Sequence, residues 1–575
     1  MGTQQAGRPL DTSLDAKGRE TTSAVFESPG KTDEMYIGPK QAIPIVFVPG
    51  IMGSPLIATG NNVGLWKKQG KWAWNPDDAV GWVVGGYGGL EPDQRRLLLD
   101  PSKTKAVETP ADADVEQLKK FCASTSMPWQ EAARRGWGSV MITSYGPILN
   151  HLENQLRFIF YRGKPYPGTY SAIPSDPGAW GQLKGYQKLA EDDLRKAAAW
   201  RFPVYAVGYN WTNSNGDAAD YLKRRIDAIR SDCRERLKLK CDKVILVTHS
   251  MGGLVARMCA KRNPGDILGV VHGVQPAIGA ATAYARVRAG WDSNTHLSAP
   301  LASLESAVGA WALGSSGAEV SAVFAGGAGP LELLPNHLYG KGWLKVQYGS
   351  GTSAETLFSL PENDPYEEIY KEQSRWWRLI HPSCLVNQEN KANTKSIKKE
   401  WVKYVKELDK AKTFHYELGN YYHPHTYAHC GADTGQQAWH RITWRLEPLR
   451  EISSGLWSNK PNPESARNAV ISTDLMRGSC EIRDPQSAGS VWVNRGGVGV
   501  TAQSQGSFYR AWLSDKDDAG DATVPAHSGL APRTHVPFFA QMRGFEHQGS
   551  YKDGPVQAVT LYSLISLACK AEKPA

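Results

Sequence analysis

The chain lacks the apolar runs that would indicate secretion through a signal peptide or anchoring in a membrane. The segment Met1 to Glu34 is polar and has no hydrophobic core of the signal-peptide kind, so we expect synthesis in the cytoplasm without such a signal. The apolar stretch Ala299–Leu334 is interrupted by Glu305, Glu319 and several glycines. We therefore do not expect it to cross a bilayer.

Cysteines and dense basic blocks are also scarce. Eight cysteines stand at wide spacing in 575 residues, which excludes a disulfide framework and fits a reducing cytoplasm. The net charge of +9 is mild for this length and forms no basic block, so we expect no nucleic-acid partner. It favours anionic surfaces such as phospholipid headgroups. The length exceeds one domain's usual core, so we expect a second sizeable unit.

One segment has the pattern of a nucleophile elbow. Val244–Val247 is a short apolar run suited to a buried strand, Ser250 follows it closely, and a helical pattern begins after Gly252 and Gly253. A serine on a sharp turn between strand and helix needs small neighbours, because the two elements pass closely. Thr248 departs from the usual first glycine. The pattern predicts Ser250 as a nucleophile, with a buried turn serine as the alternative.

The residues that would activate this serine are expected downstream. In α/β-hydrolases the chain order is serine, acid, histidine. Asp521 lies in a glycine-led turn and His547 follows in a loop, while the C-terminal run Val556–Cys569 is typical of a closing helix. Spacing alone leaves Asp521 open as a simple Asx-turn residue. His527 stands too close to Asp521 to reach both that carboxylate and the nucleophile.

A second glycine-rich turn predicts the oxyanion hole. The apolar run Ile43–Val48 ends in Pro49-Gly50-Ile51-Met52-Gly53-Ser54, where backbone amides can point at a substrate oxygen. The amide of Ile51 or Met52 would pair with the amide of Met251, the residue after the nucleophile. An ordinary strand-to-loop turn is the alternative.

Metal and cofactor sites are not expected. Histidines and a cysteine cluster at His423, His425, His429 and Cys430, but Pro424 breaks any helical register and no second pair stands at finger spacing. We favour a polar lining of the active-site cleft over a metal site there. The acidic stretch at Asp515, Asp517 and Asp518 lacks the length and glycine of an EF-hand loop, so we interpret it as a solvated turn.

The order of elements predicts an α/β fold of the α/β-hydrolase type, with a mostly parallel central sheet and a large inserted cap. Val204–Val207 and Ile267–Val271 are further core strands, and strand–helix alternation of this kind builds a sheet covered on both faces. The expected division is a polar mobile tail (1–40), a first core segment (41–285) with an insertion at 55–135, a cap or lid (286–494) and a second core segment (495–575).

Two segments of the predicted cap invite a functional interpretation. Ala299–Leu334 is small and apolar, which fits a lid over an acyl-chain pocket or, equally, a packed cap core. Lys391–Lys412 has Trp401 and Leu408 on one helical face with lysines around them. Such a helix can lie on an anionic membrane, or pack on the cap with its lysines in solvent.

Five segments in order resemble a known family. They are Pro49-Gly-Ile-Met-Gly53, Val204-Tyr-Ala-Val-Gly-Tyr-Asn-Trp211, Thr248-His-Ser-Met-Gly-Gly253, Gly520-Asp-Ala-Thr-Val-Pro525 and His547. This series resembles the lecithin–cholesterol acyltransferase group and the GPI-inositol-deacylase-like lipases. Within that group the layout is similar to the fourth family of bacterial type VI secretion lipase effectors. The chain departs from the pattern of the group at two places. Asn210 stands where the group has Asp, and the segment Val274–Gly279 lacks the histidine that the group has there.

The resemblance implies a function. By it, Ser250 is the nucleophile, Asp521 the acid and His547 the base of a serine phospholipase acting on membrane glycerophospholipids. It further implies an antibacterial toxin that a type VI apparatus delivers to a rival's periplasm, and a cognate immunity protein that restrains it in the producer. Alternatives are an acyltransferase, a soluble carboxylesterase, a peptidase on the same fold, or an inactive hydrolase-fold binding protein.

Overall fold

The computed structural model describes residues 12–14, 20–22, 39–59, 72–78, 90–161, 164–165, 177–290, 316–349, 351–387, 390–449, 458–474, 478–495 and 498–572. The predicted N-terminal tail therefore lies mostly outside the described residues, as do Trp66 and Trp82 of the predicted insertion and the first half of the segment Ala299–Leu334.

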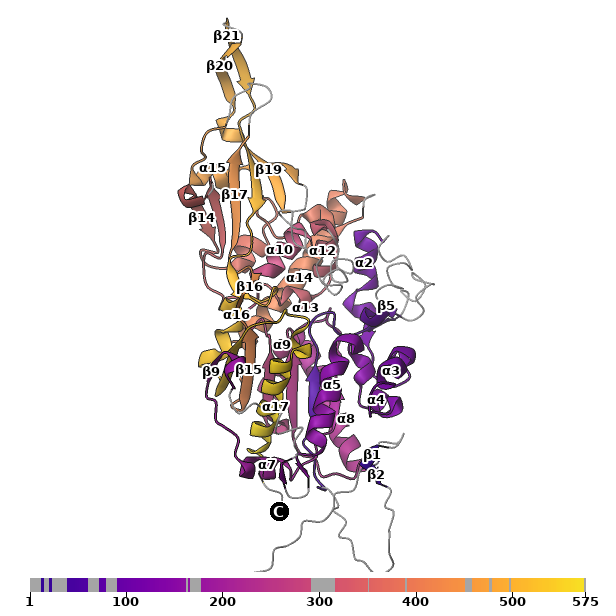
Figure 1. Cartoon of the computed structure of the whole chain (residues 1–575). Helices are drawn as coiled ribbons and strands as arrows, with labels where there is room; N and C mark the ends of the chain where they lie inside the picture. Colours follow the sequence, from indigo (N-terminus) through magenta and orange to yellow (C-terminus); the bar gives the residue numbers. More distant parts are fainter. Residues whose placement is uncertain are drawn as a thin grey trace, which may run out of the picture.

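A seven-stranded sheet forms the core in the lower half of Figure 1, in the order β10-β3-β11-β12-β15-β24-β9. Every neighbouring pair is parallel except β24 with β9, which are antiparallel. The strands are β3 (Ile45–Val48), β9 (Gln182–Lys184), β10 (Val204–Ala206), β11 (Val244–His249), β12 (Ile267–Gly273), β15 (Thr426–Gly431) and β24 (Phe538–Met542). β3, β10, β11 and β12 are buried at every residue, as their apolar runs predict.

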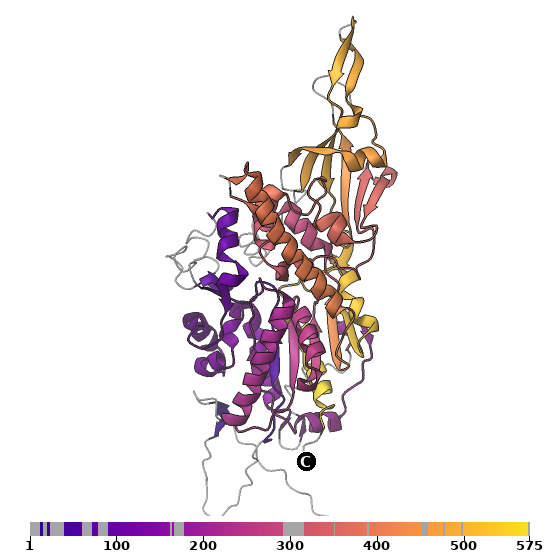
Figure 2. The same cartoon turned by 180° about the vertical axis from the view of Figure 1, so that it is seen from behind.

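Helices cover both faces of this sheet. α5 (Ile142–Arg157) and α17 (Gly554–Ala568) lie on the face seen in Figure 1, and α8 (Asn215–Glu235) and α9 (Gly252–Arg262) on the face seen in Figure 2. Each face buries its own apolar cluster, so the sheet separates two hydrophobic layers. The predicted fold class is confirmed.

In its described residues, the predicted insertion at 55–135 contains a small antiparallel sheet and three α-helices beside the core. Its strands are β4 (Leu56–Ala58), β5 (Trp72–Trp74) and β6 (Thr104–Ala106), and its helices are α2 (Pro92–Leu98), α3 (Val115–Cys122) and α4 (Trp129–Arg134).

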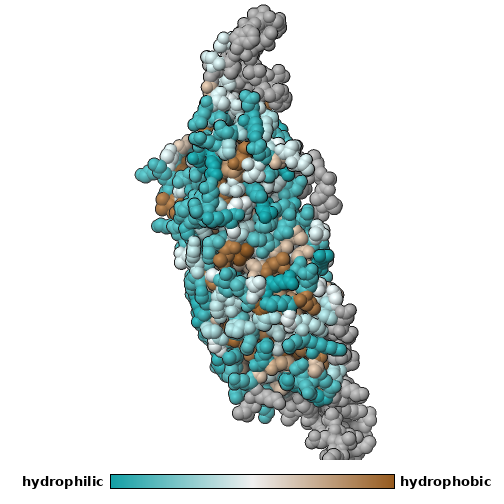
Figure 3. Space-filling view, turned by 90° about the vertical axis from the view of Figure 1, so that its left-hand side faces the viewer, coloured by the Kyte–Doolittle hydropathy of each residue, from teal (hydrophilic) through white to brown (hydrophobic). Residues whose placement is uncertain are grey.

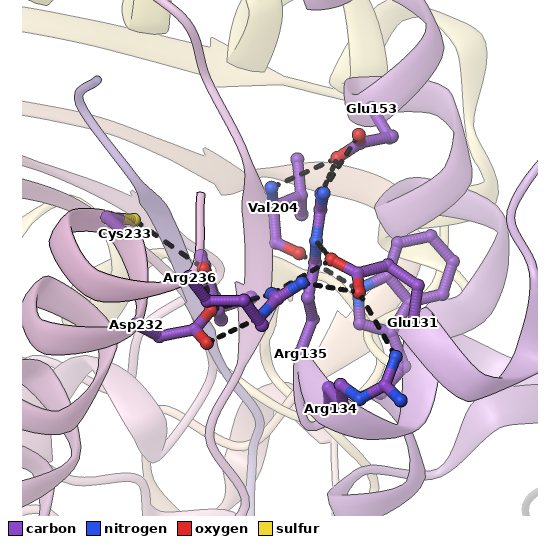
Figure 4. A network of polar contacts seen from close by, with 10 residues as sticks. Glu131, Arg134, Arg135, Glu153, Val204, Asp232, Cys233 and Arg236 are labelled. Atoms are coloured by element: carbon purple, nitrogen blue, oxygen red, sulfur yellow. Dashed lines mark hydrogen bonds and ion pairs between the residues drawn. The ribbon is translucent and has the colours of Figure 1, made fainter. Parts of the chain in front are cut away.

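A buried ion cluster fastens this insertion to the core (Figure 4). Glu131 of α4 is fully buried and accepts hydrogen bonds from Arg135 Nε at 2.7 Å and Arg236 Nη1 at 2.9 Å. Arg135 also binds both oxygens of Glu153 on α5 at 2.9 Å, and Asp232 of α8 pairs with Arg236 at 2.6 Å. The network satisfies each buried charge with an opposite one, as buried charges require.

A second, six-stranded sheet lies above the core in Figure 1, in the order β14-β13-β17-β22-β19-β18. Its strands are β13 (Leu344–Tyr348), β14 (Glu355–Leu360), β17 (Ile442–Pro448), β18 (Val470–Asp474), β19 (Ser479–Asp484) and β22 (Ser507–Leu513). A two-stranded ribbon, β20 (Gly489–Arg495) with β21 (Val498–Ser504), projects from its far end.

The cap boundaries differ from the prediction in two places. β15 lies inside the predicted cap range 286–494, yet it pairs with β12 and β24 in the core sheet. β22 lies inside the predicted second core segment, 495–575, yet it pairs with β17 and β19 of the second sheet. The sequence does not predict β15, because Thr-Tyr-Ala-His-Cys-Gly has no run of aliphatic β-branched residues.

The lysine-rich segment forms α14 (Thr394–Leu418), and its apolar face packs into the cap: Trp401, Tyr404, Leu408 and Phe414 are buried. That face is therefore not free to lie on a membrane. Within the described residues of Ala299–Leu334, α12 (Gly317–Phe324) buries Val320, Val323 and Phe324 in a packed core. Whether this segment also moves as a lid stays a prediction.

One side of the molecule is mostly hydrophilic (Figure 3). Figure 3 shows one side of the molecule, where hydrophilic residues predominate and small apolar patches lie about half-way along its length. In the described ranges, no helix combines the length and hydrophobicity needed to cross a membrane.

Candidate active site

Ser250 lies on a strained turn between β11 and α9. Its φ is +52°, in the left-handed region that costs energy for any residue except glycine. The turn allows no side chain at Gly252, since a Cβ there would lie 2.4 Å from the carbonyl oxygen of Pro49 and 2.5 Å from that of Val48. This close passage of α9 over the end of β3 is the physical reason for the glycine. Strand, strained serine and helix together form the elbow that the sequence predicts.

Thr248, the departure from the usual glycine, has a structural role of its own. It is fully buried in β11, and its hydroxyl lies 2.9 Å from His272 Nδ1 on the neighbouring strand β12. The side chain therefore links β11 to the neighbouring strand β12.

The three predicted catalytic residues meet at this turn. His547 Nε2 lies 2.8 Å from Ser250 Oγ, and His547 Nδ1 lies 2.8 Å from Asp521 Oδ2. The pairs are 297 and 26 residues apart in the chain, so only the fold brings them together. Ser250 is 5% exposed, His547 is 9% exposed and Asp521 is fully buried. Buried hydrogen bonds of this kind are strong because little solvent screens them.

Asp521 serves its turn and the histidine at once. Its Oδ1 accepts hydrogen bonds from the amides of Thr523, at 3.2 Å, and Val524, at 2.7 Å, which is the Asx-turn arrangement. Its Oδ2 is left for His547, whose own amide donates to the Asp521 carbonyl oxygen at 2.8 Å. Asp521 therefore forms an Asx turn with one oxygen and contacts His547 with the other, and its role as the acid stays a prediction.

The glycine-rich turn after β3 lies beside Ser250. The Gly53 amide donates to the Gly50 carbonyl oxygen at 3.1 Å, and Met52 takes a φ of +62°. Trp74 of the inserted strand β5 donates its indole N–H to the Met52 carbonyl oxygen at 2.7 Å. Strand β5 of the insertion thus contacts the turn that the sequence predicts as part of the oxyanion hole.

Two of the other histidines have different surroundings. His527 Nε2 is 2.9 Å from the carbonyl oxygen of Tyr339, and its ring stacks on His440, so it does not join the three residues around Ser250. His429 is buried in β15, and this burial lowers its pKa to about 4. Among the described residues, no three histidine, cysteine or acidic side chains are grouped so that they could hold a metal ion.

Two residues at the site have no signal in the sequence that predicts their contacts. Successive side chains at a turn point apart, yet the His249 side chain reaches the backbone of His547, with Nε2 3.0 Å from the His547 carbonyl oxygen. Tyr145 of α5 lies 3.0 Å from the other nitrogen, His249 Nδ1. No local pattern marks Tyr145, because it comes from a helix more than 100 residues upstream.

A model of the alpha/beta hydrolase family matches residues 167–447, which include the elbow and β15. The chain has the α/β-hydrolase fold. This hydrolase is similar over nearly its whole length to a chain in the crystal structure of the Tle4–Tli4 complex. The two are 28% identical, the match covers 92% of this chain and 98% of the other, and the TM-score is 0.64. That match confirms the predicted resemblance to the type VI lipase effectors.

Other comparisons add little to the assignment of this hydrolase. Phospholipase PlaB from Legionella pneumophila is 10% identical over 58% of this chain and 87% of its own, with a TM-score of 0.14, which is too low to carry an argument. No curated protein matches the sequence.

Asn210, which departs from the family pattern, is well satisfied in this hydrolase. Its amide nitrogen donates to the Thr104 carbonyl oxygen at 3.1 Å, and its Oδ1 accepts from the Thr212 hydroxyl at 2.7 Å. An aspartate there would face the Thr104 carbonyl without a hydrogen to donate. Asparagine therefore suits the contact between β6 and the loop before α8.

Proposed function

We propose that the protein is a serine carboxylic-ester hydrolase, a phospholipase of the A type that cleaves acyl esters of membrane glycerophospholipids. The observation that carries the proposal is the unbroken line from Asp521 through His547 to Ser250, with both hydrogen bonds at 2.8 Å. A nucleophile, a base and an acid in this relation are the components that acyl transfer requires.

The direction of proton transfer follows from the hydrogen bonds. A carboxylate only accepts, so His547 Nδ1 carries the hydrogen that binds Asp521, and the lone pair of Nε2 faces Ser250. As Ser250 Oγ attacks the ester carbonyl, Nε2 takes its proton. The tetrahedral intermediate collapses, and His547 returns that proton to the departing alcohol oxygen. Water then repeats the sequence on the acyl-enzyme and releases the fatty acid.

The amides of Met251 and Ile51 would hold the negative oxygen of the tetrahedral intermediate. Met251 stands directly before α9, so its amide lies at the positive end of an 11-residue helix. Ile51 stands in the turn closed by Gly50 and Gly53. Each such donor contributes about 3–4 kcal/mol to barrier lowering, so the backbone of this turn matters more than its side chains.

The similarity to a chain of the Tle4–Tli4 complex supports the biological context. By that similarity the enzyme is a type VI effector that acts on a rival's membrane, and a cognate immunity protein would bind it as Tli4 binds Tle4. The net charge of +9 fits an anionic bilayer substrate. The six-stranded sheet and the helices above the core would form the cap that receives the lipid.

Fatty-acid release from mixed phosphatidylethanolamine and phosphatidylglycerol vesicles tests the proposal. Ser250→Ala should reduce release by several orders of magnitude. Ser563→Ala is the matched control, because Ser563 is also buried but lies in α17, where its hydroxyl binds the Val559 carbonyl oxygen. Equal release by the wild type and Ser250→Ala would exclude the serine mechanism. A phosphonate probe distinguishes an enzyme from an inactive binding protein, because it labels Ser250 only if that serine is activated.

A further inference from the structure

A chain of hydrogen bonds joins the oxyanion-hole turn to the catalytic histidine by a second route, behind the nucleophile. The Gly50 amide lies 3.3 Å from Tyr145 Oη, Tyr145 Oη lies 3.0 Å from His249 Nδ1, and His249 Nε2 lies 3.0 Å from the His547 carbonyl oxygen. All three contacts are buried.

Every hydrogen in this chain has a determined position. A carbonyl oxygen only accepts, so His249 Nε2 must carry a hydrogen and donate to His547. Burial, followed by repulsion from His547, lowers the pKa of His249 to about 3, so the ring is neutral and Nδ1 is an acceptor. Tyr145 therefore donates its hydroxyl hydrogen to Nδ1 and accepts from the Gly50 amide. The chain runs in one direction, which strengthens each bond in it.

We infer that Tyr145 and His249 are positioning residues that couple the oxyanion-hole turn to the catalytic base, so that both halves of the active site hold their working geometry together. The inference rests on the proposed ester hydrolysis. Neither side chain takes part in the chemistry. Tyr145 orients the Gly50 end of the turn, and His249 orients the backbone that carries the His547 ring.

The turn is shaped to close tightly on these two rings. A Cβ at Gly50 would lie 2.8 Å from His249 Nδ1 and 3.0 Å from Ser250 Cβ, and a Cβ at Gly53 would lie 2.8 Å from two atoms of the Tyr145 side chain. Both glycines of this turn are therefore needed because the His249 and Tyr145 side chains leave no room for a Cβ. Any side chain there would push the turn away from Tyr145 and lengthen its hydrogen bond.

The first turns of α5 act as a platform for both halves of the site. The Met141 amide donates to the Gly53 carbonyl oxygen at 2.8 Å, and Gln548, next to the base, donates to Ser144 Oγ at 2.9 Å. The N-terminus of α5 is capped from the insertion, since Asp77 accepts from the amides of Ile142 and Thr143 at 2.9 Å. Tyr145 thus lies in the first turn of a helix whose N-terminal end is hydrogen-bonded to Gly53, Gln548 and Asp77.

The neutrality of His249 also serves the reaction. Its ring centroid lies 5.0 Å from that of His547, which becomes positively charged when it takes the serine proton. A second cation at that distance in a buried site would raise the energy of the intermediate. Histidine at 249 therefore supplies one donor and one acceptor without adding a charge.

Four variants test the inference on a soluble short-chain ester and on a phosphonate probe that reports Ser250 reactivity. Tyr145→Phe and His249→Phe should each lower kcat about 10- to 100-fold with KM changed less than about twofold, because each breaks one link of a buried chain. His249→Gln should recover most of the loss, since an amide offers one donor and one acceptor. The double variant Tyr145→Phe with His249→Phe should be no worse than His249→Phe, because both break the same chain.

Tyr562→Phe is the control, a buried tyrosine on α17 whose hydroxyl binds the Gln187 carbonyl oxygen at 2.9 Å. It should keep wild-type rates. Losses that multiply in the double variant, wild-type rates in Tyr145→Phe, or no recovery in His249→Gln would overturn the inference. If the wild type reacts with the phosphonate but releases no fatty acid from vesicles, only the lipid substrate is refuted. The role of Tyr145 and His249 is then tested by the rates at which the variants react with the phosphonate. A wild type inert to phosphonate overturns both proposals.

Discussion

Replacing Asp521 with asparagine should disable the site by reversing the hydrogens of His547. Oδ1 of Asp521 accepts from two backbone amides, so the asparagine oxygen is expected to keep that position. The new amide nitrogen then faces His547 Nδ1 and donates to it, which forces the imidazole hydrogen onto Nε2. A protonated Nε2 cannot accept the Ser250 proton.

The size of the loss in kcat depends on the cost of rotating the asparagine side chain. Rotating the asparagine by 180° would restore the correct imidazole tautomer, but it leaves two backbone amides, one buried and one partly buried, facing an NH₂ group. At about 1–3 kcal/mol for each unsatisfied buried group, the rotated form costs about 2–6 kcal/mol. At 1.36 kcal/mol for each tenfold change, that predicts a loss in kcat of roughly 30- to 26,000-fold. The same exchange in a serine protease triad costs about 10⁴-fold.

The assay is steady-state hydrolysis of a soluble ester by Asp521→Asn, with thermal unfolding measured in parallel. The unfolding midpoint should stay near that of the wild type, because the side chains have similar volume and both amide contacts persist. Asp518→Asn is the matched control: its carboxylate accepts from the His527 amide at 3.0 Å and does not touch His547. A loss of less than about tenfold in Asp521→Asn would refute the tautomer argument.

Two further predictions concern stability. Glu131→Ala should destabilise the fold by about 1.5–3 kcal/mol in urea unfolding, because Arg135 and Arg236 lose their hydrogen bonds to Glu131 but keep Glu153 and Asp232, while kcat of the folded enzyme stays unchanged; a change below about 0.5 kcal/mol would contradict this. Burial lowers the pKa of His429 from 6.5 to about 4. Below pH 6.5 the unfolded chain therefore binds a proton that the folded chain does not, and the free energy of unfolding decreases as the pH is lowered from 6.5 to 4. At about 1.36 kcal/mol per pH unit, His429→Gln should reduce the stability lost between pH 7.5 and 4.5 by about 2–3 kcal/mol, and equal losses in both proteins would refute it.

The elbow and the parallel core could be predicted because their signals are local. Apolar runs longer than a turn, a serine between strand and helix, and glycines where two elements pass closely are all written in adjacent residues. β15 could not be predicted in this way, because its burial comes from its neighbours β12 and β24 and not from its own composition. The histidines in and before β15 therefore predict a polar lining of the cleft or a metal site, and not a strand.

The amino-acid sequence by itself determined which residues could do chemistry: an activated serine at 250, an acid at 521, a base at 547 and a glycine turn after Val48. It also determined their order, which limits the fold to a few topologies. Only the tertiary structure decided that Asp521 divides its two oxygens between a turn and a base, and that Tyr145 and His249 join the two halves of the site. The physical reason is that hydrogen bonds and burial depend on distance in space, and the residues joined here are up to 298 positions apart in the chain.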